Sequence, residues 1–350
     1  MEFKIANKKI GDQYPCFIVA ELSSNHCQKY DLAVKTIKAI AKAGADAVKL
    51  QTYTSDSLSL NIKNKYFPIA KEGLWKGMTD YQVYQKAFTP WDWQPKLKKL
   101  AESLGLICFS APYDNQAVEF CAKMKMPAYK VGSPEIIDMP LIEHMALQGK
   151  PMIISTGVAN LNDINLAVKT CKNQGNNQIV LLKCSCAYPT PLEELNLNNI
   201  IALKKKFKTI VGLSDHTLSS NVALAAVVLG ARLVEKHFIL DRKLPSQDKD
   251  FSLEPAEFKN MVESIREVEK ALGRVNYQFT ANLQAARKGS RSLFVVKDIK
   301  RRGRLTSDNI RSIRPGDGLA PKYFKKVLTK KAKKDLKKGT PLKWKDLQNL

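Results

Sequence analysis

Gly212-Leu213-Ser214-Asp215-His216-Thr217 and Glu235-Lys236-His237-Phe238 contain two of the four histidines in the chain. Each stretch ends a short apolar run, and a helix-like segment, 219–229, separates the two. This order predicts a strand, helix, strand unit with a histidine at the carboxyl end of each strand. Parallel α/β sheets and barrels place their chemistry at that edge. Because neutral imidazole is a common ligand of divalent metals, His216 and His237 predict a metal site.

The same pattern recurs along residues 1–273. Each run is followed by a polar or glycine-bearing turn, and its β-branched content fits a buried parallel strand. The eight apolar runs are 17–20, 47–50, 106–109, 128–131, 152–154, 179–182, 210–213 and 232–235. Eight alternating units predict a (β/α)8 TIM barrel.

Amphipathic segments between the runs predict the helices. Asp31 is expected to cap a helix over 32–43, and Pro255 to begin a helix that runs to Leu272. The aromatic-rich insertion 55–95 follows the second strand. It is therefore expected on the catalytic side, as a lid or a substrate wall.

Composition indicates an ordinary globular protein of 350 residues, 44% of them hydrophobic. The N-terminus has no signal-peptide pattern, and no apolar run reaches the length of a membrane span. Seven cysteines are spread along the chain without zinc-ribbon spacing. We expect a cytoplasmic protein with free thiols and no membrane partner.

The net charge of +24 permits nucleic-acid binding. However, the lysines are scattered, and the small basic clusters at 204–206, 300–302 and 330–334 contain no stacking aromatics. We interpret the charge as a lysine-rich surface whose field attracts anionic substrates, with no nucleic-acid partner. A basic polyanion-binding protein is the alternative from another functional class.

The apolar pattern lapses over 274–289, which we interpret as a linker. Residues 290–350 form a second, small and basic domain. Fewer than about 70 residues make a marginal core, so this domain is expected to dock on something larger.

Lys49 and Lys130 lie inside otherwise apolar runs. A buried lysine is costly unless it is paired, so two at neighbouring strand ends predict a bound anion. A phosphate, or a phosphate plus a carboxylate, fits this pattern. Further donors would be the hydroxyls of Ser110, Ser133, Ser155 and Ser214.

Three other interpretations of these strand ends stay open. A lysine could form a Schiff base, although the paired histidines argue against that chemistry. A lysine could instead form a structural ion pair with Glu21 or Glu235. Cys184 and Cys186 could join the histidines in a zinc site.

Taken together, the motifs resemble the sialic acid synthase family over nearly the whole chain. The stretches that carry the resemblance are 20–26, 49–54, 155–157, 187–189, 212–217 and 235–238. The end of the chain, 291–316, resembles the antifreeze-like (SAF) domain of that family. The resemblance implies condensation of phosphoenolpyruvate with an amino sugar.

Within the family, 20–23, 235–242 and 251–255 are most similar to the pseudaminic acid branch. N-acetylneuraminate and legionaminic acid synthases are the alternatives. Two departures stand out. Cys186 replaces a usual serine or asparagine, and 245–248 replaces a Gly-Gly-Pro-Asp loop.

The resemblance also implies roles for individual residues. His216 and His237 would hold the metal. Oxygen donors around two histidines suit Mn²⁺ or Mg²⁺, and we expect Glu21 or Glu235 to be the catalytic acid that steers the attacking water. The expected phosphoenolpyruvate ligands are Lys49, Ser110, Lys130, Ser133, Ser155 and Ser214. The expected sugar ligands are Glu21, Gln51, Tyr188, Asp248 and Arg314. A domain-swapped homodimer is implied, in which Arg314 of one chain completes the site of the other.

Overall fold

Eight parallel strands close into a barrel in the computed structural model, which describes residues 1–73 and 75–349. In chain order the strands are β3 (Phe17–Glu21), β4 (Ala47–Thr52), β5 (Ile107–Pro112), β6 (Tyr129–Val131), β7 (Met152–Ser155), β8 (Ile179–Lys183), β9 (Ile210–Asp215) and β10 (Leu233–His237). Strand β10 pairs with β3 and closes the ring. The TIM barrel predicted from the eight apolar runs is confirmed.

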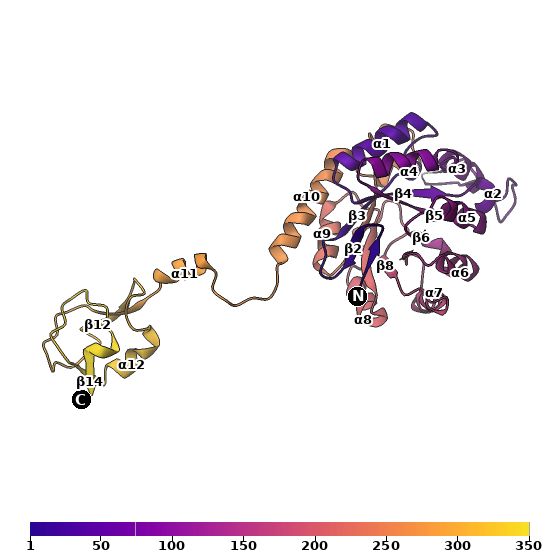
Figure 1. Ribbon diagram of the computed structural model, residues 1–350. Helices are drawn as coiled ribbons and strands as arrows, with labels where there is room; N and C mark the ends of the chain where they lie inside the picture. Colours follow the sequence, from indigo (N-terminus) through magenta and orange to yellow (C-terminus); the bar gives the residue numbers. More distant parts are fainter. Residues whose placement is uncertain (74, 350) are drawn as a thin grey trace. The chain divides into compact units, whose positions relative to one another are not determined.

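Helices surround the strands (Figure 1). They are α1 (Tyr30–Lys42), α4 (Gln94–Ser103), α5 (Asn115–Lys123), α6 (Met139–Leu147), α7 (Leu161–Asn173), α8 (Asn199–Phe207), α9 (Ser220–Val228) and α10 (Pro255–Leu272). The insertion after β4 adds α2 (Ser55–Leu58) and α3 (Asp80–Ala87). Within the described residues, no helix combines the length and the apolar character needed to cross a membrane.

Helix α10 begins at Pro255 as predicted, and Gly273 follows it with a φ of +48°. The prediction for α1 was wrong at its start. Lys29, with extended backbone, is the N-cap and forms no side-chain cap. Asp31 lies in the first turn, where its carboxylate interacts favourably with the helix dipole.

Side chains alternate between the two faces of each strand, and this divides the core into two layers. One set, including Val19, Phe109 and Ile153, fills the barrel interior. The other set, including Leu50 and Val131, packs against the helices. An N-terminal hairpin that was not predicted, β1 (Glu2–Ile5) and β2 (Lys8–Gly11), adds two fully buried isoleucines to the interior layer.

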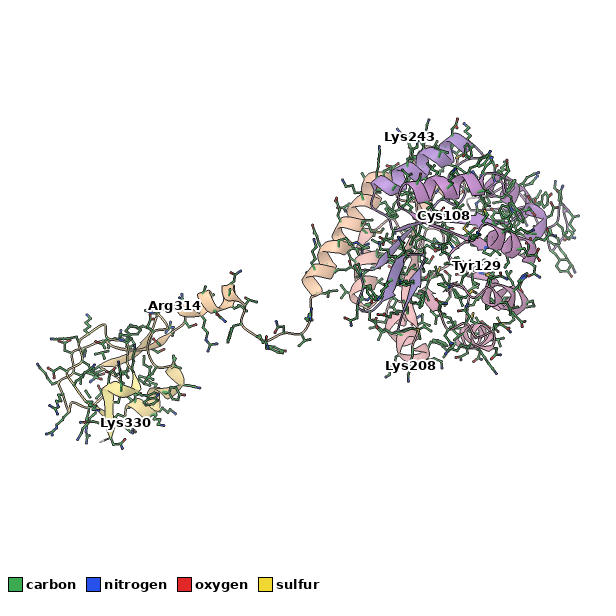
Figure 2. The ribbon with its side chains drawn as sticks, in the orientation of Figure 1. Cys108, Tyr129, Lys208, Lys243, Arg314 and Lys330 are labelled. Carbon is green, nitrogen blue, oxygen red and sulfur yellow. The ribbon has the colours of Figure 1, made fainter. Side chains whose placement is uncertain are left out.

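Residues Met1–Gly273 and Arg274–Leu350 form two compact units. The second contains α11 (Ala281–Lys288), β11 (Ser292–Val295), β12 (Ile310–Ile313), α12 (Phe324–Val327), β13 (Lys330–Ala332) and β14 (Leu347–Asn349). Helix α11 lies in the segment predicted as a linker. The unit has a small core of its own, built around residues such as Leu293, Ile310 and Leu342. Figure 2 labels Arg314 and Lys330 within it.

Candidate active site

A cavity of about 380 Å³ lies where the carboxyl ends of the barrel strands meet. Most of the predicted site residues line it: Glu21, Lys49, Gln51, Lys130, Ser133, Ser155, Tyr188, Ser214, His216, Glu235, His237 and Asp248. Strand register explains why they meet. Glu21 is the neighbour of both His237 and Lys49, and Glu235 is the neighbour of Ser214. Residues in register share a face of the sheet, so these side chains enter the barrel together.

Ser110 does not line this cavity. Its side chain is fully buried, its Oγ lies 2.6 Å from Thr52 Oγ1, and it donates to the Leu50 carbonyl over 3.1 Å. Ser110 is in register with Leu50, which packs in the outer layer against the helices. Since strand residues alternate between faces, Ser110 points away from the barrel interior, and its predicted contact with phosphoenolpyruvate was wrong.

Arg314 belongs to the second compact unit, where it follows β12 and is exposed. Figure 2 labels it there. The barrel unit by itself therefore supplies every predicted site residue that lines the cavity.

Lys49 forms two short ion pairs on the cavity floor. Its Nζ lies 2.6 Å from Glu235 Oε1 and 3.0 Å from Glu21 Oε2, and all three side chains are buried. Burial alone would lower the pKa of Lys49, but the two carboxylates outweigh it, and the pKa is raised. The predicted alternative of a structural ion pair therefore describes this lysine.

Lys130 enters the same floor with weaker partners. Its Nζ donates to the Val131 carbonyl over 2.9 Å and lies 3.8 Å from Glu235 Oε1. Burial lowers the pKa of Lys130, and the attraction of Glu235 does not fully offset this. A buried ammonium without a close carboxylate favours an anionic ligand, because the ligand would supply the missing counter-charge.

Glu21 connects the lysine pair to the histidines. Its Oε2 lies 3.1 Å from His237 Nε2, and its Oε1 accepts from Gln51 Nε2 over 3.0 Å. Burial would raise the pKa of Glu21, but Lys49 and His237 together hold it well below its usual range. The carboxylate is therefore ionised at neutral pH.

The ring centroids of His216 and His237 are 5.4 Å apart. His216 Nδ1 donates to the Ser185 carbonyl over 2.9 Å, so in the neutral ring Nε2 carries the lone pair. His237 Nδ1 is buried and has no hydrogen-bond partner among the described residues. This pair fits two ligands of a divalent metal, and the remaining ligands would come from substrate and water.

The alternative zinc site gains no support. Cys184 lines the cavity, yet no three His, Cys, Asp or Glu side chains within 1–73 and 75–349 are grouped to hold a metal. All seven cysteines are free thiols.

Several buried polar atoms in the cavity lack a partner within the described part of the chain. They are Trp75 Nε1, Glu135 Oε2, Ser155 Oγ, Glu235 Oε2 and His237 Nδ1. An unpaired buried group costs about 1–3 kcal/mol, and native proteins contain few of them. Their convergence on one cavity indicates a polar ligand that satisfies them.

Sequence reasoning missed two of these residues. Glu135 follows β6 within Gly132-Ser133-Pro134-Glu135, and burial raises the pKa of its carboxyl. An acid two residues beyond Ser133 was a signal that could have been used. Trp75 lies in the insertion that was predicted to be a lid or wall, but its irregular surroundings gave no periodicity that would select it.

Comparison with known proteins follows the same division of the chain. The NeuB family model matches residues 36–277, and the SAF domain model matches residues 290–348. A pseudaminic acid synthase of Campylobacter jejuni is 43% identical over 95% of this chain and 96% of its own length. A pseudaminic acid synthase of Helicobacter pylori is 43% identical, with 95% and 98% covered.

A solved N-acetylneuraminic acid synthetase from Leptospira borgpetersenii, in complex with citrate, superimposes with a TM-score of 0.73. It is 29% identical, and the match covers 82% of this chain and 95% of that one. The family model spans well over half of the 350 residues, and the relatives match nearly end to end. This chain therefore belongs to the NeuB family.

Proposed function

We propose that this chain is a pseudaminic acid synthase. It condenses phosphoenolpyruvate with 2,4-diacetamido-2,4,6-trideoxy-L-altrose to give pseudaminic acid and phosphate. Identity of 42–43% to three pseudaminic acid synthases over 95% of the chain carries this proposal. The cavity supports it independently, because it combines buried lysines, carboxylates and a histidine pair.

The anionic substrate would bind at the lysine side of the cavity. Lys130 and Lys49 provide positive charge, and Lys130 has the weaker protein partners. The hydroxyls of Ser133, Ser155 and Ser214 add donors, and Ser155 Oγ has no partner among the described residues. Charge-assisted hydrogen bonds of this kind are the strong contacts for phosphate and carboxylate.

The open-chain sugar would bind beside the histidines, in contact with Glu21, Gln51, Tyr188 and Asp248. The Asp248 carboxylate is held in place by Ser23 and Ser24, and its Oδ2 lies 3.9 Å from His237 Nδ1. His216 and His237 would hold Mn²⁺ or Mg²⁺. The metal would supply Lewis-acid polarisation of the aldehyde oxygen.

The reaction then requires two bond-forming events. C3 of phosphoenolpyruvate attacks the aldehyde carbon, and the aldehyde oxygen takes up a proton. Water adds to C2 and gives one proton to Glu235 or Glu21, which balances the proton taken up by the aldehyde oxygen. The C2 hydroxyl then passes its remaining proton to the phosphate as the C–O bond to phosphate breaks, which leaves the C2 ketone and inorganic phosphate. Glu235 Oε2 has no partner within the described residues, so it has a lone pair available for this proton.

The functional assembly in this proposal is a homodimer in which the small domain of one chain brings Arg314 to the site of the other. Seven free thiols favour a reducing compartment, so we place the reaction in the cytoplasm.

A panel of amino sugars tests the proposal. The full chain is incubated with phosphoenolpyruvate, Mn²⁺ and one sugar at a time, and phosphate release and product mass are measured. The 2,4-diacetamido-2,4,6-trideoxy-L-altrose should give the highest kcat/KM. A higher value with N-acetylmannosamine, or with the sugar precursor of legionaminic acid, would assign the chain to another branch of the family.

A further inference from the structure

Helices α2 and α3 of the insertion 55–95 contribute side chains to the cavity lining. Reciprocal side-chain caps at Thr54 and Thr79 fix the starts of α2 and α3. The Tyr81 hydroxyl donates to Asp56 Oδ1 over 3.2 Å and connects α3 to α2. The insertion therefore forms a defined wall.

This wall is apolar, whereas the floor of the barrel cavity is charged. Leu58, Val83 and Ala87 line the cavity from α2 and α3. Val83 and Ala87 are one turn apart, at i and i+4, so they lie on one face of α3, and they are 5% and 8% exposed. The cavity is thus suited to a ligand with an anionic or polar side and several apolar groups opposite.

Aromatic side chains hold the edge of the wall in place. Tyr84 on α3 packs edge-to-face on Tyr53, with ring centroids 5.9 Å apart, and Tyr53 packs on Tyr113 at 5.2 Å. All three rings line the cavity. This chain of rings couples the insertion to the ends of β4 and β5, so the aliphatic surface keeps a fixed position relative to the catalytic floor.

Trp75 adds a single polar group to this wall. Its indole Nε1–H is buried, lines the cavity and has no acceptor within the described residues. A buried donor without a partner is costly, so the ligand is expected to present an acceptor here.

We propose that Leu58, Trp75, Val83 and Ala87 form the subsite that selects the sugar by its deoxygenated and acetylated positions. The inference rests on the proposed function, whose sugar carries a C6 methyl and two acetamido groups. The aliphatic side chains cover the methyl groups, and the Trp75 indole donates to an acetamido carbonyl oxygen. A 6-hydroxyl at this wall would be buried without a partner, which disfavours 6-hydroxy hexoses.

The test compares two sugars that differ at one atom. kcat/KM is measured for 2,4-diacetamido-2,4,6-trideoxy-L-altrose and for its 6-hydroxy counterpart, at saturating phosphoenolpyruvate. Val83→Thr keeps the side-chain shape but replaces a methyl group with a hydroxyl, and Leu58→Asn likewise replaces apolar groups with polar ones on α2. Each variant should lower kcat/KM for the 6-deoxy sugar about 10-fold, which is the size of effect that one methyl group has in an apolar pocket. Each should also raise the ratio of kcat/KM for the 6-hydroxy sugar to kcat/KM for the 6-deoxy sugar.

In the same variants, KM for phosphoenolpyruvate should be unchanged, because the lysine floor is not altered. Trp75→Phe keeps an aromatic ring but removes the donor, and should raise KM for both sugars equally. Leu60→Asn is the matched control, since Leu60 lies in the same insertion, is 55% exposed and does not line the cavity. It should behave as wild type.

The possible outcomes distinguish a failure of the proposed subsite from a failure of the proposed function. Wild-type inactivity on both sugars would overturn the proposed function. Wild-type activity with an unchanged sugar ratio in Val83→Thr and Leu58→Asn would overturn the subsite alone. Thermal melts verify that each variant is folded, and the Leu58 variant keeps the test decisive if Val83→Thr unfolds.

Discussion

Lys49 and Lys130 share a cavity floor, yet the structure assigns them different energetic roles. Lys49 pairs with both Glu21 and Glu235, whereas Lys130 has one distant carboxylate and a backbone carbonyl. Removing one partner of a buried ion pair leaves an uncompensated charge and costs about 3–5 kcal/mol. Lys49 therefore stabilises the site, and Lys130 is the cation more available to substrate.

This difference predicts separable effects of two substitutions. Lys130→Met should raise KM for phosphoenolpyruvate roughly 10- to 150-fold, the loss of one charge-assisted contact of about 1.5–3 kcal/mol. Lys49→Met should in addition lower the free energy of unfolding by about 3–5 kcal/mol, measured by urea denaturation. Ser110→Ala, outside the cavity, is the control for KM. A normal KM in Lys130→Met would show that this lysine does not bind the substrate.

The buried side chain of His26 predicts how the stability of the fold depends on pH. Its Nδ1 accepts from the Gln28 N–H over 3.1 Å, its Nε2 lies 3.1 Å from Thr89 Oγ1, and its side chain is fully buried. Burial lowers the pKa of His26 from 6.5 to about 4, and Asp248 opposes this only in part. The fold therefore holds His26 neutral, with its proton on Nε2.

Between pH 6.5 and 4 the unfolded chain binds a proton at His26 that the folded chain does not. Stability is then fully present above pH 6.5 and declines as the pH falls to about 4, by about 3 kcal/mol from this group. Urea denaturation across this range measures the slope. His26→Asn, which keeps an acceptor near Nδ1, should flatten the slope relative to His144→Asn. Equal slopes in the two variants would contradict this account.

At the scale of secondary structure, side chains along β9 and β10 alternate between the cavity and the opposite face of the sheet. Ser214, Glu235 and His237 face the cavity, while Asp215 and Lys236 face the other way. Lys236 Nζ lies 2.5 Å from Asp215 Oδ2, and both side chains are fully buried. This ion pair connects β9, which ends one residue before His216, to β10, which ends at His237.

Comparison of a single with a double variant tests the strand connection. Lys236→Met leaves the Asp215 carboxylate buried without its cation and should lower the free energy of unfolding by about 3–5 kcal/mol. Asp215→Asn combined with Lys236→Met removes both charges and should be more stable than Lys236→Met alone. Chemical denaturation measures both. A double variant less stable than Lys236→Met would show that the pair does not act as a unit.

The features that the sequence predicted correctly are those with a regular spacing of apolar and polar residues. Short β-branched runs predicted every barrel strand, and polar residues just beyond them predicted where the cavity side chains lie. The Ser110 error came from ignoring the two-residue period, since Ser110 is in register with outward-facing Leu50. Trp75 was not predicted, because it lies in an insertion that has no periodicity to select it. Glu135 was missed although it follows Ser133 by two residues, in the 3-10 helix Pro134–Ile137.

At the scale of the whole molecule, the proposal of exchanged small domains predicts complementation. Arg314→Ala and His216→Ala should each be nearly inactive. In a mixed dimer, one site would receive an intact histidine from one chain and an intact arginine from the other. Random pairing gives half mixed dimers with one good site each, so co-refolding should restore about a quarter of wild-type activity, on the symmetry of a closed two-fold dimer. No recovery in verified mixed dimers would mean that Arg314 acts within its own chain or not at all.

The central claim is that the barrel cavity joins phosphoenolpyruvate to an amino sugar with a metal held by His216 and His237. The most direct measurement is phosphate release coupled to product mass, with 2,4-diacetamido-2,4,6-trideoxy-L-altrose as the sugar. Chelation should abolish phosphate release, Mn²⁺ should restore it, and the product should have the mass of pseudaminic acid. His216→Ala and His237→Ala should stay folded and inactive with Mn²⁺ present. Full activity after exhaustive chelation, or in either histidine variant, would contradict the account.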